Sequence, residues 1–311
     1  MNTVTVKGVQ SWRKSWAARK LALWLLLSIM LSLIFFRKSL TGLPAMLSPD
    51  WVLGQYHASG WGVLAVCLVV LWLKRKEMWQ GMSREGSLIV IPIGLALIAG
   101  ALLMPSSQDY LVFQLLLASL GVFVTLFGYA AKIPSVLLVT YGFVISFPLA
   151  MQSFAENAYT QTAMVPLMGL MNVLDYPVAQ AGQRLHFIST SGEAISVSVT
   201  IGCAGTTTMG VFMALFTLMM LDKPLPLKKA GWLFLFGVVG TWFQNLVRLV
   251  LLILAGYYLG KNALWTAHLW IVYTLFPLWY LFFAYMYFRQ GGQSPKVRRM
   301  QELKYITETG R

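Results

Sequence analysis

Residues 231–256 read GWLFLFGVVGTWFQNLVRLVLLILAG, an apolar run that contains a single charged side chain. About 20 helical residues cross the hydrocarbon core of a bilayer, so this run is long enough to span it. Further runs of the same kind predict an all-α polytopic membrane protein of about eight transmembrane helices. The expected spans are roughly 17–36, 55–73, 87–104, 111–131, 133–151, 204–221, 231–256 and 269–288.

The composition supports the same fold class. Of the 311 residues, 58% are hydrophobic and only 11% are charged, whereas soluble domains carry about 25% charged residues. The net charge of +14 comes from too few side chains to cover a face with cations, as nucleic-acid binding requires. We therefore expect one integral membrane domain over residues 1–311 and no nucleic-acid partner.

The distribution of Lys and Arg predicts the orientation of the chain. With the N-terminus inside, 19 of the 24 Lys and Arg lie in the inner segments 1–20, 74–86, 132, 222–230 and 289–311. The positive-inside rule then places both termini in the cytoplasm, for a multi-pass protein of the plasma (inner) membrane. The parts would be five N-terminal spans (1–151), an extracytoplasmic loop (152–203), a three-span core (204–290) and a cytoplasmic basic tail (291–311).

The long outer loop is expected to contain a short β-hairpin before the sixth helix. Ile and Val alternate with Ser and Thr over residues 195–201, the period of two that is typical of a strand. The predicted strands are Arg184–Ile188 and Ala194–Ile201, joined near Gly192. Earlier in the loop, the apolar stretch Ala163–Leu174 predicts an amphipathic helix along the membrane interface.

Cys203 lies where the second predicted strand meets the sixth helix. A thiol near a helix N-terminus feels the positive end of the helix dipole, which suits a reactive sulfur. Thr206, Thr207 and Gly210 make one face of the helix start small and polar. The alternative interpretation is a small, half-buried residue with no chemical role, and that is what we expect of Cys67 in the middle of a span.

Arg248 is the one Lys or Arg that lies in none of the inner segments or outer loops, and it is inside the seventh predicted span. An ionisable residue at such a place costs on the order of 3 kcal/mol and is a functional-site hypothesis by default. Thr241, Gln244, Asn245 and Arg248 follow one another at three or four residues, so they form one polar stripe on the helix. The alternative is an Arg that snorkels to the headgroups, which does not need polar neighbours deeper in the span.

His268 begins the eighth span, between two interfacial Trp residues. Taken alone, it fits a hydrated interfacial side chain, as do His57 and His186. The derived topology, however, brings Cys203, Arg248 and His268 to the outer face. A thiol, an imidazole and a guanidinium at one depth are the groups of a cysteine acyl-transfer site. Paired intramembrane carboxylates, a metal-ligand cluster and a phosphate-binding loop are missing from the sequence, so no metal and no cofactor is expected.

Three short motifs resemble those of the exosortases and archaeosortases. They are Gly202-Cys203-Ala204-Gly205, then Asn245-Leu246-Val247-Arg248, then Ala267-His268-Leu269. Ala204 stands where Ser is usual in the family, and the third-position His is similar to the bacterial exosortases. The resemblance covers about residues 160–290.

The resemblance implies a membrane cysteine transpeptidase, a hydrolase acting on peptide bonds. It would cleave a C-terminal sorting signal (short motif, transmembrane helix, basic tail) at the outer face through a thioester, and transfer the product to a surface acceptor. Cys203, Arg248 and His268 would be catalytic, with Asn245, Gly205 and Thr206 in support. The implied partners are membrane-anchored protein substrates, the lipid bilayer and exopolysaccharide machinery. Two alternatives stay open, a non-enzymatic transporter or export partner for surface polysaccharide, and a membrane acyltransferase.

Overall fold

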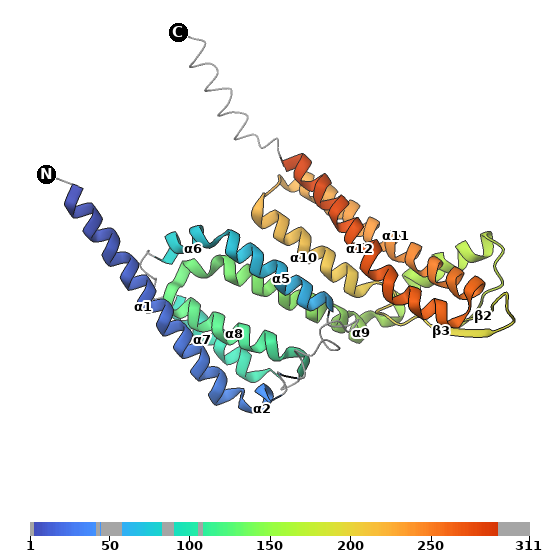
Figure 1. Cartoon of the computed structure of the whole chain (residues 1–311), viewed down its shortest axis with the longest axis horizontal. Helices are drawn as coiled ribbons and strands as arrows, with labels where there is room; N and C mark the ends of the chain where they lie inside the picture. The colour runs from blue at the N-terminus through green and yellow to red at the C-terminus, as the bar shows by residue number, and fades with distance from the viewer. Residues whose placement is uncertain (1–2, 42–43, 45–57, 83–89, 105–107, 292–311) are drawn as a thin grey trace, which may run out of the picture. The chain divides into compact units, whose positions relative to one another are not determined.

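The computed structural model describes residues 3–41, 44, 58–82, 90–104 and 108–291, and helices dominate this part of the chain (Figure 1). Within the described residues, each of the eight apolar segments lies largely in a helix, which confirms the predicted α-helical class. His57, most of the loop 37–54 and the basic tail after Gly291 lie outside the described residues. The elements are α1 (Thr3–Phe35), α2 (Arg37–Leu40), α5 (Ala58–Leu73), α6 (Arg75–Met82), α7 (Val90–Leu103), α8 (Gln108–Phe127), η1 (Gly128–Ala131), α9 (Lys132–Val173), β1 (Ala179–Ala181), β2 (Arg184–Ile188), β3 (Ala194–Ser198), α10 (Thr206–Asp222), α11 (Leu227–Leu259) and α12 (Lys261–Gly291).

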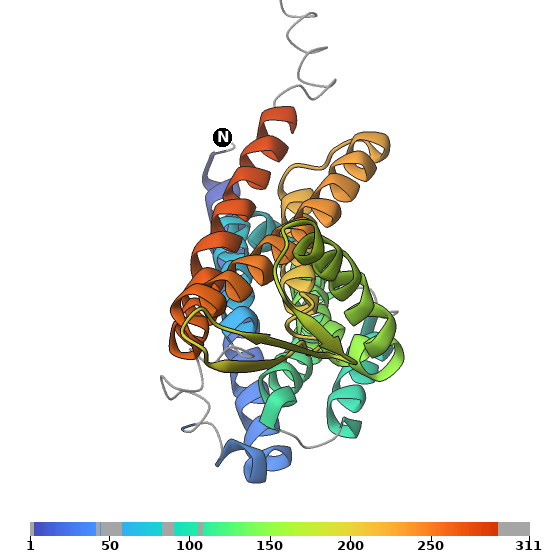
Figure 2. The same cartoon turned by 90° about the vertical axis from the view of Figure 1, so that its right-hand side faces the viewer.

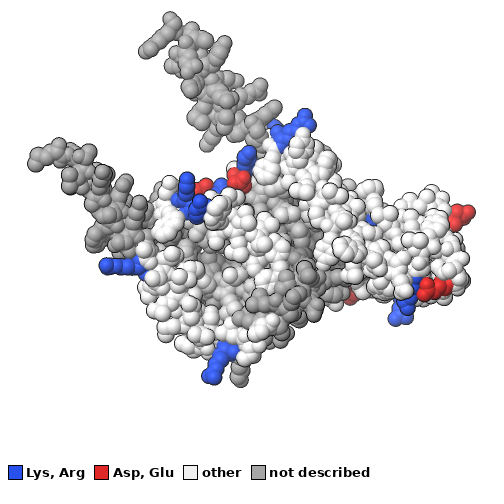
Figure 3. All heavy atoms as spheres, viewed as in Figure 1, with Lys and Arg blue, Asp and Glu red and all other residues white. Residues whose placement is uncertain are grey.

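Length and hydropathy make this a multi-pass membrane protein. Within the described residues, four helical stretches are long and apolar enough to cross a bilayer, namely 18–35, 111–173, 227–259 and 261–290. The second contains the fourth and fifth predicted spans, and three shorter apolar helices at 60–73, 90–103 and 206–222 correspond to the remaining ones. Most of the face in Figure 3 is uncharged, with Lys, Arg, Asp and Glu gathered in a few places. Such a surface suits contact with lipid.

The chain divides into two compact units, Met1–Gly142 and Phe143–Arg311. In the first unit, α7 and α8 pack closely through glycines, since a Cβ on Gly121 would lie 2.7 Å from the carbonyl oxygen of Gly94. Small residues allow this approach between membrane helices. Helix α1 joins α8 through the indole of Trp24, which donates to the Ser119 carbonyl at 3.0 Å.

Helix α9 extends well beyond the predicted fifth span. The helix continues to Val173 through a kink at Ala155 (φ −143°, ψ 21°), so the chain stays helical past residue 151, the predicted end of the fifth span. The stretch predicted as a separate amphipathic helix from Ala163 is the last part of α9. It is two-sided as expected, because Met164, Leu167 and Met171 are buried at helical spacing.

A three-stranded antiparallel sheet in the order β1-β2-β3 follows α9. The hairpin of β2 and β3 was predicted. In the structure it places Phe187 opposite Ile195 and Leu185 opposite Val197. Two details of the prediction are wrong. The strand β1 was missed, and β3 ends at Ser198 rather than Ile201 because the chain turns there towards α10.

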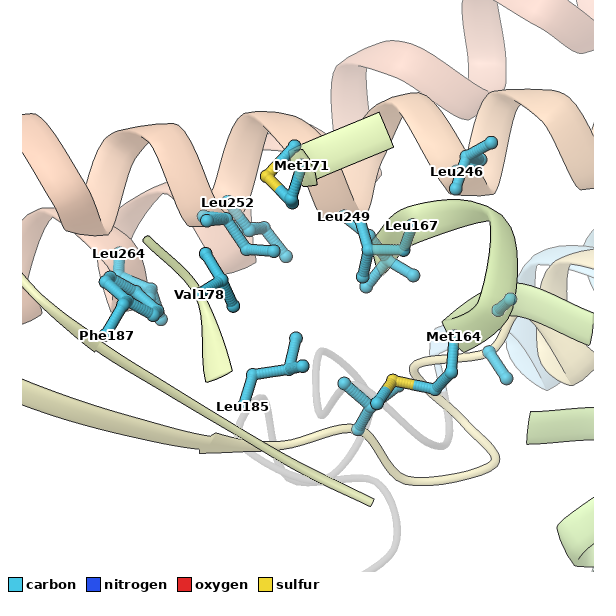
Figure 4. Packing of buried hydrophobic residues seen from close by; sticks show 14 of the residues in the cluster. Met164, Leu167, Met171, Val178, Leu185, Phe187, Leu246, Leu249, Leu252 and Leu264 are labelled. Carbon is cyan, nitrogen blue, oxygen red and sulfur yellow. The ribbon is translucent and has the colours of Figure 1, made fainter. Parts of the chain in front are cut away.

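The buried side of the sheet packs on α9 and α11 (Figure 4). In Figure 4, Leu185 points into the cluster and Phe187 lies beside Leu264 of α12. The core cluster also holds Ala204, and Cys203 packs at its margin. The same hydrophobic contacts that hold the hairpin therefore fix the position of the segment that carries the thiol.

The tip of the hairpin is fastened to the turn between α11 and α12, next to which it lies in Figure 2. The backbone N–H of Thr190 donates to the Tyr257 carbonyl at 2.9 Å. The Glu193 carboxylate accepts from the backbone N–H of Lys261 at 3.0 Å and so satisfies one of the free donors at the start of α12.

The three C-terminal helices run alternately. The hydroxyls of Tyr280 and Tyr287 in α12 donate to the carbonyls of Thr208 and Lys223, at 2.8 and 2.7 Å. The later donor in α12 thus bonds to the later acceptor, so α10 and α12 run in the same direction. Helix α11, which lies between them in the chain, runs in the opposite direction. The start of α10, the last part of α11 and the start of α12 consequently share one end of the second unit.

Candidate active site

Cys203 lies in a tight turn between β3 and α10. Residues 201–205 form consecutive turns, and α10 begins at Thr206 rather than at the predicted residue 204. The buried hydroxyl of Thr206 donates to the Ile201 carbonyl at 3.2 Å and closes the turn across its base. Cys203 itself is half-buried, and this bond holds the backbone on either side of it.

Gly205 fits this turn for two separate reasons. Its φ is +96°, in the left-handed region that favours glycine. A Cβ at this position would also lie 2.8 Å from Cγ of Asn245, too close for any real side chain. The turn and helix α11 thus meet at a point where only a hydrogen atom fits.

A comparison of two glycine variants measures this close approach. Gly192, in the hairpin turn, also has positive φ (+83°) but no atom within 4 Å of a built Cβ. We expect Gly192→Ala to cost about 1–2 kcal/mol from the left-handed backbone alone. Gly205→Ala should cost about 1–3 kcal/mol more because of overpacking, visible as a clearly lower Tm of the detergent-solubilised protein. Equal Tm values for the two variants would contradict the contact with Asn245.

Asn245 links the thiol-bearing turn to the buried cation. Its side-chain N–H donates to the carbonyl of Cys203 at 3.1 Å, and its Oδ1 accepts from Nη1 of Arg248 at 3.3 Å. The side chain is 2% exposed, so water does not compete for these bonds. One amide thereby sets the position of Cys203 relative to Arg248.

Arg248 is buried, with 4% of its surface exposed. The side chain therefore does not extend to solvent, as the snorkelling alternative would require. The guanidinium lies beside the Cys203 side chain and interacts with it electrostatically. Its Nε is buried and has no hydrogen-bond acceptor among the described residues, which leaves a donor unused at this point.

His268 lies in the first turns of α12. The ring is half-buried and feels the charge of the Arg248 guanidinium. Trp265 packs edge-on against it, with ring centroids 5.9 Å apart and planes at 75°. Arg248 is therefore the common electrostatic neighbour of the thiol and the imidazole, and the structure brings the three predicted residues together.

This order of motifs and this geometry agree with a comparison of the chain with known families. The family model of the transmembrane exosortases matches residues 51–287, more than half of the chain. The chain belongs to the transmembrane exosortase family. Family membership supports a membrane transpeptidase-type role. No curated protein and no solved structure matches the chain.

The polar stripe on α11 of this exosortase divides into two parts. Thr241 and Gln244 bind α12, since the Trp279 indole donates to the Thr241 hydroxyl at 3.0 Å and Gln244 donates to the Leu275 carbonyl at 3.0 Å. These bonds join two helices inside the bundle. Only Asn245 and Arg248, the last two residues of the stripe, interact with Cys203.

Thr200 is a site residue that the sequence analysis did not single out. Its hydroxyl donates to Sγ of Cys203 at 3.5 Å. In the sequence it is one of several polar residues that alternate with Ile and Val, and no signal distinguishes it from them. Ala204, at the position where the exosortase pattern usually has Ser, is buried in the core cluster.

Two other residues considered in the sequence analysis, Cys67 and His186, are placed by other elements. Cys67 is buried in the first unit and donates to the Leu137 carbonyl at 3.7 Å. His186 faces outwards from β2. Over the described ranges, no group of three or more His, Cys, Asp and Glu side chains gathers in a way that could hold a metal ion.

Proposed function

We propose that this exosortase is a plasma-membrane cysteine transpeptidase that cleaves C-terminal sorting signals at the outer membrane face. The observation that carries the proposal is Arg248, a buried cation that interacts electrostatically with both a half-buried thiol and a half-buried imidazole. A cation buried in a membrane helix is costly, and this one is used by two groups with the chemistry of acyl transfer.

In the first half of the reaction, the sulfur of Cys203 attacks the carbonyl carbon of the scissile peptide bond. The proton of the thiol passes to His268, and the carbonyl oxygen becomes an oxyanion. Arg248 donates to that oxygen, for which its unused Nε is suited. When the C–N bond breaks, His268 returns the proton to the leaving amine and a thioester on Cys203 remains.

In the second half, an amine on a surface acceptor attacks the thioester carbonyl. His268 takes the proton of this amine, the new amide bond forms, and the sulfur leaves with the proton. Water in place of the amine would give hydrolysis by the same steps. Asn245 orients both Arg248 and the Cys203 turn throughout, because its two hydrogen bonds join them.

The shape of the expected substrate follows from the topology. If both termini of the enzyme are cytoplasmic, the site lies at the outer end of α10, α11 and α12. A substrate with one transmembrane helix and a basic cytoplasmic tail then presents the residues that precede its helix at the depth of Cys203. Exopolysaccharide machinery at the membrane is a suitable partner, because a surface polymer would supply the acceptor.

Trapping of the intermediate tests this function. The probe is a reporter protein that ends in a motif–helix–basic-tail signal taken from the same genome, here called the sorting-signal reporter. Brief incubation with enzyme-containing membranes should give a reporter–enzyme adduct that survives denaturation and is released by hydroxylamine. A hydroxylamine-sensitive adduct with labelled lipid instead would indicate a membrane acyltransferase, and the lack of any adduct would favour a non-enzymatic transporter or export partner.

A further inference from the structure

The strand β3 has one edge paired with β2 and one edge that pairs with no other strand among the described residues. Val199 donates to the Gln183 carbonyl, and Ser189 donates to the Glu193 carbonyl. The two-residue period of an antiparallel ladder therefore turns the backbone groups of residues 195 and 197 towards β2. The N–H and C=O groups of Ala194, Ser196 and Ser198 point the other way, out of the sheet edge.

This edge has none of the features that usually protect an exposed strand. Within the described part of the chain, the backbone of Ala194, Ser196 and Ser198 makes no hydrogen bond on that side. All three residues are exposed and small. The strand has no Pro, no charged side chain and no bulge, the usual means of preventing a further strand from pairing.

The open edge leads directly to the thiol. Only four residues, 199–202, separate β3 from Cys203, so the last strand residue is at most about 18 Å from the Cys203 backbone even for an extended chain. Thr200, within this short connection, already touches the sulfur. A peptide aligned with β3 would pass along the connection to the reactive atom.

We propose that the extended segment of the substrate, just before its transmembrane helix, pairs with β3 as a fourth strand and so delivers its scissile carbonyl to Cys203. This inference rests on the proposed function, since it assumes a peptide substrate. Main-chain hydrogen bonds to Ser196 and Ser198 provide the affinity, and alternate substrate side chains provide the selectivity. The opposite edge of the sheet, β1, has only three residues and lies two strands away from β3.

Disulfide mapping tests the pairing. Ser196→Cys is made in a Cys203→Ala background, which removes the competing thiol and prevents turnover. Single cysteines are then placed in turn along the ten or so residues before the helix of the sorting-signal reporter. Strand pairing predicts crosslinks at every second reporter position, because side chains alternate across a strand and disulfides need close Cβ atoms. Gln180→Cys on β1 is the matched control and should give none.

Several outcomes would overturn the inference. These are the lack of crosslinks at Ser196→Cys, equal crosslinking at Gln180→Cys, crosslinks without alternation, and an enzyme–enzyme disulfide through Ser196→Cys, which would assign the edge to a second copy of the chain. Each leaves the proposed function standing if the hydroxylamine-sensitive adduct still forms with the wild-type enzyme. Failure of that adduct would instead remove the function itself.

A kinetic comparison in the active enzyme adds a second measurement. Ser196→Pro removes an outward N–H without breaking the ladder to β2, and Pro is tolerated at strand edges. We expect about a tenfold or greater loss of reporter processing at low reporter concentration, largely recovered at high concentration. Gln180→Pro, which removes an outward N–H on the other edge of the sheet, should stay within about twofold of wild type. Unchanged processing by Ser196→Pro would contradict the pairing.

Discussion

Replacing Cys203 by Ala is expected to abolish processing of the sorting-signal reporter. The variant has no atom that can form the thioester, and loss of a covalent nucleophile typically lowers the rate by about 10⁴-fold or more. On a gel, the reporter should stay full-length and no hydroxylamine-sensitive adduct should form. Cys203→Ser should fail as well, because a hydroxyl in place of the sulfur is a much weaker nucleophile at neutral pH.

The chain offers its own control for this experiment. Cys67 is the other cysteine, and it is buried in the first unit, whereas the candidate site residues belong to the second. Cys67→Ala should process the reporter at the wild-type rate, apart from any loss of protein level caused by the small cavity. Undiminished processing by Cys203→Ala would end its assignment as the nucleophile.

Replacing Arg248 by Lys is expected to have the second-largest effect. The planar guanidinium bonds to Asn245, lies beside Cys203 and still has an unused donor. An ammonium group is a point charge with a different set of donor directions and cannot reproduce this arrangement. We expect reporter processing to fall by about 100-fold to 1000-fold, the usual cost of losing an oxyanion donor.

A surface arginine of the same unit provides the matched control. Arg184 is exposed on β2, so Arg184→Lys should process the reporter within about twofold of wild type. The amount of each variant in the membrane and its Tm in detergent separate a catalytic defect from misfolding. A fully active Arg248→Lys enzyme would reduce Arg248 to a simple positive charge and would contradict its role as a directed donor.

Much of the fold follows from patterns that the sequence displays openly. Hydropathy identifies all eight apolar helices, and the alternation at residues 195–199 identifies β3. The strand β1 was missed because Ala179–Ala181 has neither alternation nor β-branched residues, and its pairing with β2 depends on the tight turn at Gly182. The helical continuation of α9 beyond residue 151 was not predicted, because it accompanies the packing of Met164, Leu167 and Met171 against the sheet, which is a tertiary contact.

For the site, the sequence provides the chemical groups but not their connections. Cys203, Arg248 and His268 can be recognised by residue type and by depth in the membrane. The role of Asn245 as a link between Cys203 and Arg248 depends on a contact across 42 residues, which no local pattern reveals. Gly205 is similar, because the close atom belongs to α11 rather than to its own turn. Their functional roles stay predictions until the variants are measured.

The hairpin is attached at both ends, at its tip to the turn between α11 and α12 and at its base to the Cys203 turn. The length of the hairpin must therefore match the distance between these two attachments. One residue inserted into β3 would turn its buried side chains to the open face and would shift the thiol away from Asn245. The number of residues in this strand thus matters as much to the geometry of the candidate site as the identity of any side chain in it.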